Sequence, residues 1–137
     1  MTDFALDPRL ADDTRAVGDL SLCSVLLVDD ARFPWFVLVP RRAGAVEITD
    51  LSDEDAATLM SEVRVATRVM LALSQPDKVN VGALGNVVPQ LHVHVVGRFR
   101  SDPVWPGPVW GHGTRQPYPD HAAAALLERA AGLFAAA

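Results

Sequence analysis

Two histidines, His92 and His94, stand two residues apart in the stretch 90–98, where polar and apolar residues alternate. This alternation is typical of a β-strand, in which successive side chains point to opposite faces of the sheet. We therefore expect Gln90, His92 and His94 to share one face of the strand. A neutral imidazole is a nucleophile near neutral pH, and a second imidazole beside it can donate hydrogen bonds. The spacing predicts a site in which both rings act on one molecule.

Displacement at phosphorus is one chemistry that this arrangement allows. A ring nitrogen of His92 can attack a phosphorus atom and form a phosphohistidine-type intermediate, which water then hydrolyses. Because charge sits on the non-bridging phosphoryl oxygens, the site needs fixed donors, and His94 and the amides of Gln90 and Asn86 are candidates. The other ring nitrogen of His92 must keep one tautomer, for which a backbone carbonyl is the usual partner.

Two other interpretations of the histidines stay open at this stage. His92 and His94 can both ligate a zinc ion, but a third ligand is then required, from His112 or from an acid. The sequence shows no compact third ligand, and we predict no metal site. The two histidines can also be surface residues, or core residues with satisfied ring nitrogens, that carry no chemistry.

Size and charge limit the classes of protein to consider. The chain has 137 residues, half of them hydrophobic, which predicts one domain over residues 1–137 with a core of its own. The formal net charge is −5, and the basic residues form no long run. A nucleic-acid polymer is therefore not expected as a partner, whereas binding of a single nucleotide is not excluded.

Cysteine content and hydropathy bear on location. Cys23 is the only cysteine, so no internal disulfide can form, which fits a reducing compartment. The N-terminal stretch 1–7 is acidic and lacks the basic and apolar regions of a secretory signal. No apolar run is long enough to span a bilayer. We predict a cytoplasmic protein without a membrane partner.

The elements that must position the histidine strand are a mixture of helices and strands. The sequence predicts a short helix over 8–13, a hairpin of strands 20–28 and 35–39, a long helix between the N-cap Ser52 and Pro76, a strand over 78–84, the histidine strand, and a final Ala-rich helix capped by Asp120. This order predicts an α+β fold, in which one long helix packs on an antiparallel sheet and a second helix closes the chain. The apolar face of the histidine strand, Leu91, Val93 and Val95, is expected to pack on the long helix.

The segment 101–119 contains five prolines and is expected to lack regular structure. Segments of this length without regular structure are often functional in compact domains. This one carries Trp105, Trp110 and His112, which can cover a base, reach a partner subunit or simply pack the loop.

The stretch 85–96, which ends in Gln90-Leu91-His92-Val93-His94-Val95-Val96, resembles the signature of the histidine triad (HIT) family, His-φ-His-φ-His-φ-φ with φ apolar. It departs from the signature at the first histidine, where this chain has Gln90. The upstream stretch 34–41 is similar to the family's strand that ends in a Pro-Lys/Arg pair, and members often have a histidine where Trp35 stands. The resemblance runs from about Leu20 to the end of the histidine strand, with the two motifs in the family's order.

The resemblance implies a HIT-like α+β fold, a homodimer and no redox cofactor, and we expect no cofactor at all. It implies nucleotidyl hydrolases and transferases, such as those that act on diadenosine polyphosphates or nucleoside phosphoramidates. These enzymes act at the α-phosphate through a nucleotidyl-histidine intermediate. By this resemblance His92 is the nucleophile and His94 contacts phosphate oxygens. Gln90 keeps the main-chain carbonyl that orients the nucleophile, although its amide cannot act as an acid near neutral pH.

Four further residues are candidates for substrate binding by the same resemblance. Asp30 falls where the family has a ribose-binding group, and Asn80 and Asn86 fall where it has polar groups near the phosphate. Trp35 is a candidate site wall. Each also has a purely structural explanation, as a turn residue or a buried core tryptophan. A module that binds nucleotides without turning them over is the main alternative to an enzyme.

Overall fold

Five antiparallel strands form one sheet, in the order β1-β2-β3-β5-β4, in the computed structural model, which describes residues 3–137. The strands are β1 (Thr14–Asp19), β2 (Cys23–Val28), β3 (Trp35–Pro40), β4 (Lys78–Gly82) and β5 (Val93–Arg98). The helices are α1 (Pro8–Asp13), α2 (Asp53–Ser74) and α3 (Asp120–Ala136), with a short 3-10 turn η1 (Ile48–Asp50) before α2. Met1 and Thr2, which begin the acidic N-terminal stretch, lie outside the described residues.

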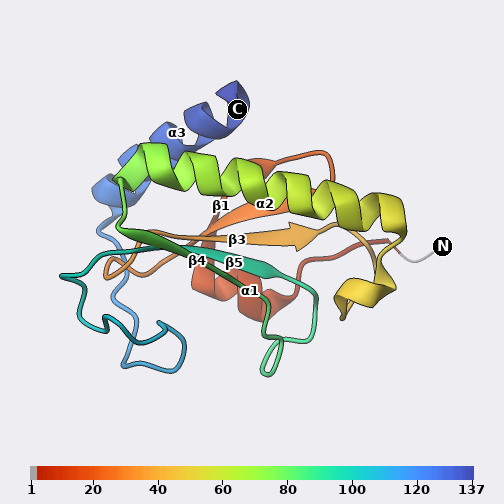
Figure 1. The fold of residues 1–137 in the computed structure, drawn as a ribbon, viewed down its shortest axis with the longest axis horizontal. Coiled ribbons are helices and arrows are strands. Elements are labelled where there is room, and N and C mark those ends of the chain that lie inside the picture. The colour runs from red at the N-terminus through yellow and green to blue at the C-terminus, as the bar shows by residue number, and fades with distance from the viewer. Residues whose placement is uncertain (1–2) are drawn as a thin grey trace.

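Helices α2 and α3 cover one face of the sheet, and α1 and the segment that follows β5 lie on the other side (Figure 1). Every residue of β3 and β5 is buried, because both faces of these central strands are covered. Leu91, Val93 and Val95 share a core with Leu59 and Met70 of α2, as the sequence predicts. The α+β class and the long helix on an antiparallel sheet are therefore confirmed.

Local signals explain the boundaries of α2. The Ser52 hydroxyl accepts a hydrogen bond from the Asp55 N–H at 3.1 Å, which caps the first turn. The helix ends where Gln75 adopts a left-handed backbone conformation with φ 51°, just before Pro76. Within the helix, the buried Glu62 accepts the N–H groups of Leu22 and Cys23 at 3.0 and 2.8 Å and ties α2 to the start of β2.

The structure differs from the sequence prediction at several boundaries. The sequence does not predict strand β1, because its residues are half-buried or exposed at the sheet edge and carry no strong apolar pattern. The histidine strand begins at Val93 instead of Gln90, since Leu91 leaves the ladder and donates its N–H to the Ala45 carbonyl. The prediction that Asp120 caps α3 is wrong, because Pro119 holds the N-cap position and Asp120 lies in the first turn.

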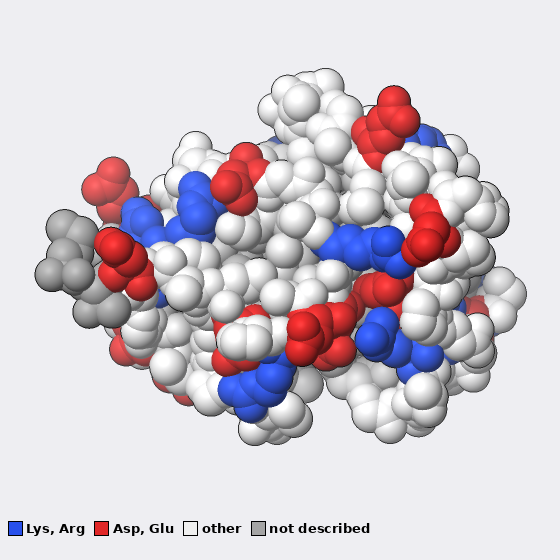
Figure 2. Space-filling view, turned by 180° about the vertical axis from the view of Figure 1, so that it is seen from behind, with Lys and Arg blue, Asp and Glu red and all other residues white. Residues whose placement is uncertain are grey.

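The surface carries charges of both signs. Figure 2 shows Lys and Arg side chains interspersed with Asp and Glu side chains over the face that it draws. On that face neither sign gathers into one large patch, which agrees with the lack of a long basic run in the sequence. Among the described residues, no helix combines the length and the apolar character that crossing a membrane requires.

Candidate active site

The two histidines line a cavity of about 690 Å³ on the face of the sheet opposite α2. Its lining residues come from α1, β1, β2, β3, the turn between β2 and β3, β5 with the residue His92 before it, and the segments 84–88 and 109–115. The rings of His92 and His94 lie 4.9 Å apart between centroids, so the two side chains face the same space as the spacing predicts. Both are buried, with 6% and 9% of their surface exposed.

A backbone carbonyl determines the tautomer of His92. Its Nδ1 lies 2.6 Å from the Gln90 carbonyl oxygen. A carbonyl oxygen only accepts hydrogen bonds, so the ring proton is on Nδ1. The Nε2 atom of a neutral His92 therefore keeps its lone pair, which is the form that a nucleophile needs.

His94 is held in the opposite tautomer. The indole N–H of Trp35 donates to Nδ1 of His94 at 3.0 Å, so the proton of the neutral ring is on Nε2. Burial, and to a smaller extent the neighbouring His92, lowers the pKa of His94 from 6.5 to about 4. His94 is consequently a neutral hydrogen-bond donor at physiological pH.

Trp110 completes an aromatic enclosure around His94. Its ring lies 5.3 Å from the His94 ring and 6.4 Å from the Trp35 ring, both edge-on. Gly82 pairs with His94 across β4 and β5, and a Cβ atom there would lie 3.2 Å from the Trp110 ring. The missing side chain at Gly82 leaves room for the indole, and a glycine inside a strand is the sequence signal that could have indicated this close approach.

The Gln90 side chain points away from the cavity and toward the N-terminal segment. Its Oε1 accepts the Asp7 N–H at 2.8 Å, and its Nε2 donates to the Ala5 carbonyl at 2.8 Å. Arg9 fastens the same segment by donating to the Val87 carbonyl at 2.9 Å. Gln90 is not among the lining residues, so only its main-chain carbonyl takes part in the site.

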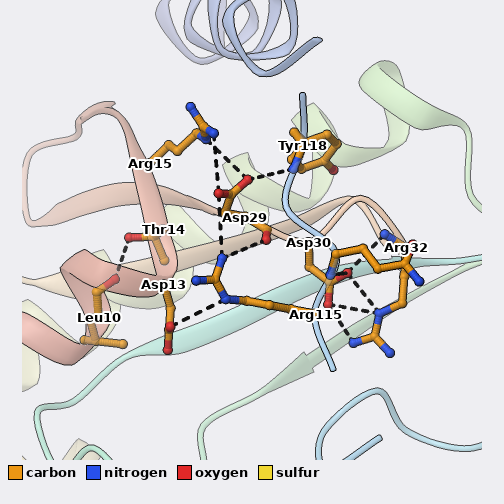
Figure 3. Close-up of polar contacts among 10 residues, drawn as sticks. Leu10, Asp13, Thr14, Arg15, Asp29, Asp30, Arg32, Arg115 and Tyr118 are labelled. Atoms are coloured by element: carbon orange, nitrogen blue, oxygen red, sulfur yellow. Dashed lines mark hydrogen bonds and ion pairs between the residues drawn. The ribbon is translucent and has the colours of Figure 1, made fainter. Parts of the chain in front are cut away.

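Asp30 lines the cavity, but its carboxylate is already engaged by hydrogen bonds (Figure 3). Arg32 donates to it from Nη2 at 2.7 Å and from Nε at 3.0 Å, and the Gln116 N–H donates at 3.3 Å. Burial raises the pKa of Asp30, but these hydrogen bonds outweigh burial, and the net pKa lies below the usual value. Asp30 is thus an ionised partner of Arg32 in this structure.

The segment after β5 reaches the site and is fastened beside Asp30. The Tyr118 N–H donates to the Asp29 carboxylate at 3.0 Å, and Arg115 donates to the Asp29 carbonyl at 3.2 Å (Figure 3). The stretch 109–115 of this segment lines the cavity, with Trp110 and His112 among its lining residues. The sequence left three roles open for this segment, namely covering a base, reaching a partner subunit and packing the loop.

The two asparagines have different surroundings. Asn86 lines the same cavity as the two histidines. Asn80 does not, because its Oδ1 accepts a hydrogen bond at 3.0 Å from Arg98, which also pairs with Asp102 at 2.9 Å. This buried network organises the segment that follows β5. The structure therefore brings Trp35 into contact with His94, places Asn86 and Asp30 in the lining of the same cavity, and leaves Asn80 outside.

The zinc interpretation needs a third ligand. Within residues 3–137, no group of three or more His, Cys, Asp or Glu side chains is arranged to hold a metal ion. The Nδ1 atoms of both histidines are also engaged, by the Gln90 carbonyl and the Trp35 indole.

Comparison with known proteins assigns the family. The family model of the HIT domain matches residues 9–101, and the chain belongs to this family. A histidine triad protein from Marinobacter aquaeolei is 42% identical, with 98% of each chain covered and a TM-score of 0.95. A histidine triad protein from Bradyrhizobium japonicum is 40% identical, with 97% of this chain and 99% of that chain covered and a TM-score of 0.94.

A curated relative is matched over a shorter length. An AP-4-A phosphorylase from Mycobacterium tuberculosis is 39% identical over 72 residues. The matched region is 48% of this chain and 36% of the relative, so the chain spans only about a third of that protein.

Proposed function

We propose that this protein is a nucleotidyl hydrolase or transferase that acts at an α-phosphate through a nucleotidyl-histidine intermediate on His92. Membership of the HIT family and the similarity to an AP-4-A phosphorylase support nucleotide hydrolase or transferase chemistry in general terms. The observation that carries the finer proposal is the 2.6 Å contact between Nδ1 of His92 and the Gln90 carbonyl, which leaves Nε2 free to attack. Dinucleoside polyphosphates and nucleoside phosphoramidates are the substrate types to consider.

The first step forms a bond between Nε2 of His92 and the α-phosphorus. The bond from phosphorus to the leaving atom breaks, and the leaving group takes its electron pair. The positive charge that develops on the His92 ring is shared with Nδ1–H, which stays hydrogen-bonded to the Gln90 carbonyl. Nε2–H of His94 donates to a phosphoryl oxygen, where charge gathers in the transition state.

The second step releases the nucleotide. A water oxygen attacks phosphorus, the phosphorus–nitrogen bond breaks, and its electron pair returns to Nε2 of His92. The water proton passes to solvent, and the site is restored. In a transferase, another nucleophile takes the place of water.

The remaining cavity residues have proposed roles in binding. Trp35 and Asn86 are proposed to form walls of the part of the cavity that holds the phosphate, because both line the cavity together with the histidines. A contact between Asp30 and ribose hydroxyls requires exchange of a hydrogen bond that Asp30 now accepts from Arg32 or Gln116. Asn80 is proposed to act only indirectly, through Arg98.

The proposal is tested by turnover of adenylated and guanylated phosphoanhydrides without added metal. We expect His92→Ala to lower turnover by more than about 10³-fold, because it removes the nucleophile. His121→Gln, at an exposed position on α3, is the matched control and should behave as the wild type. Mass spectrometry of quenched wild-type samples should show a nucleotidyl adduct on His92.

Two outcomes would contradict this assignment. Turnover that persists in His92→Ala would show that another group is the nucleophile. Tight nucleotide binding without product and without adduct, across the whole panel, would favour the nucleotide-binding module instead.

A further inference from the structure

Position 90, where the family signature has a histidine, holds a glutamine in this chain. The Gln90 amide satisfies both of its polar ends outside the cavity, on the Asp7 N–H and the Ala5 carbonyl, each at 2.8 Å. An amide has no proton to transfer near neutral pH, and this one is also turned away from the substrate space. Position 90 therefore supplies no acid to a departing group.

The two histidines cannot supply an acid either. The only proton on neutral His92 is on Nδ1, directed at the Gln90 carbonyl, and Nε2 is the attacking atom. His94 is neutral, because Trp35 donates to its Nδ1 inside a buried aromatic enclosure. A neutral imidazole donates a hydrogen bond from Nε2 but does not give up that proton near pH 7.

Within residues 3–137, the other titratable side chains that line the cavity are Asp13, Asp30, Arg32, His112 and Arg115. Asp30 is ion-paired with Arg32 at 2.7 Å, and Asp13 lies 3.7 Å from Arg115. Guanidinium groups do not act as acids in proteins. His112 is exposed, and its backbone carbonyl accepts a hydrogen bond from Arg32 at 2.9 Å.

We infer that this site cleaves an α-phosphorus bond efficiently only when the leaving group departs as a stable anion, as a phosphate, polyphosphate or nucleotide does. The inference rests on the proposed function and selects phosphoanhydrides over phosphoramidates. When a phosphoanhydride is cleaved, the bridging oxygen takes the electron pair and leaves on a phosphate, with no proton added. An amine must gain a proton as the phosphorus–nitrogen bond breaks, because it otherwise departs as an amide anion. General acid catalysis contributes about 10² to 10⁴-fold, and this contribution is missing here.

The experiment compares leaving groups on one nucleoside phosphate. The substrates are the 4-nitrophenyl ester, the phenyl ester and the phosphoramidate of AMP, together with diadenosine tetraphosphate, and kcat/KM is measured for each. We expect the 4-nitrophenyl ester to exceed the phenyl ester by about 100-fold or more. We expect the tetraphosphate to be cleaved, and the phosphoramidate to stay at the background of His92→Ala.

Substitutions then test whether a side chain of this site acts as an acid. Because the side chain at position 90 points toward Asp7 and Ala5, Gln90→His should leave the ratio of phosphoramidate to tetraphosphate turnover unchanged, with circular dichroism confirming that the variant is folded. His112→Gln should also leave this ratio unchanged. A gain of about tenfold in phosphoramidate turnover in a folded Gln90→His variant would contradict the placement of position 90 away from the departing group.

The results separate this inference from the proposed function. Comparable turnover of the phosphoramidate and the tetraphosphate, both lost in His92→Ala, would overturn the leaving-group inference and leave the function intact. Phosphoramidate turnover that disappears in His112→Gln would overturn it as well and identify His112 as the acid. If His92→Ala turned over every substrate like the wild type, the proposed function itself would fail, and the inference with it.

Discussion

His92 and His94 illustrate how one short strand can present two imidazoles with opposite properties. The acceptor beside Nδ1 of His92 is a carbonyl, and the donor beside Nδ1 of His94 is the Trp35 indole. The two Nε2 atoms therefore differ, because that of neutral His92 keeps a lone pair and that of neutral His94 carries a proton. A site for attack on phosphorus needs this combination of a nucleophile and a fixed donor.

The lowered pKa of His94 has a measurable effect on stability. The folded protein holds this ring neutral down to about pH 4, whereas an unfolded histidine binds a proton below about pH 6.5. The contribution of His94 to the free energy of unfolding is therefore complete above about pH 6.5 and is lost as the pH falls toward 4. Over the whole interval the loss is roughly 3 kcal/mol.

Urea unfolding at about pH 7 and pH 4.5 checks this expectation. The wild type should lose more stability between the two pH values than His94→Gln, which cannot titrate at this position. His121→Gln, which removes an exposed histidine, should lose as much as the wild type. An equal loss in all three proteins would show that burial of His94 does not lower its pKa.

At the scale of the elements, close packing of α2 on β5 positions the histidines. A Cβ atom at Gly97 would lie 2.9 Å from both Sδ of Met70 and Cγ of Pro34. Gly97 also donates its N–H to the Pro34 carbonyl at 2.9 Å. Because Gly97 has no side chain, α2 and β5 can approach closely just beyond the histidines.

We expect Gly97→Ala to destabilise the fold by about 1–3 kcal/mol, because the added methyl group overpacks the contact with α2. Gly18→Ala in β1 is the matched control, since nothing lies within 4 Å of a Cβ atom there. Chemical denaturation of both variants gives the comparison. Equal stability of the two variants would mean that Met70 and Pro34 move aside without cost.

At the scale of the whole molecule, edge strand β4 and the segment after it expose apolar side chains. Val81, Leu84 and Val87 are 51%, 47% and 77% exposed. Sheet edges and exposed apolar patches favour association, and a two-fold dimer is the commonest symmetric assembly. The homodimer implied by the family resemblance stays a prediction.

Sedimentation velocity at micromolar concentration tests the dimer. We expect a dimer for the wild type and a shift toward monomer for Val81→Lys, which places a charge on the exposed edge strand. Met60→Lys, on the exposed side of α2, is the control and should leave the assembly unchanged. A wild type that sediments only as a monomer would show the prediction to be wrong.

Periodicity and local signals in the sequence determined much of this protein by themselves. They predict the α+β class, the long helix from Ser52, the buried strand that begins at Trp35 and the shared face of His92 and His94. These features depend on the spacing of side chains that are close together in the sequence, because a helix repeats about every 3.6 residues and a strand every two. They can therefore be predicted from neighbouring residues.

Tertiary structure alone decided which partner each polar side chain meets. Gln90 binds the backbone of residues 83 and 85 positions away, and Trp35 binds His94 from 59 positions away. Asn80 is engaged by Arg98, and Asp30 by the segment that carries Gln116. Such contacts depend on how the layers pack, because a hydrogen bond forms with whichever group the fold brings within about 3 Å. The spacing of the histidines therefore indicated the site, but only the fold decided which of its groups are free to act.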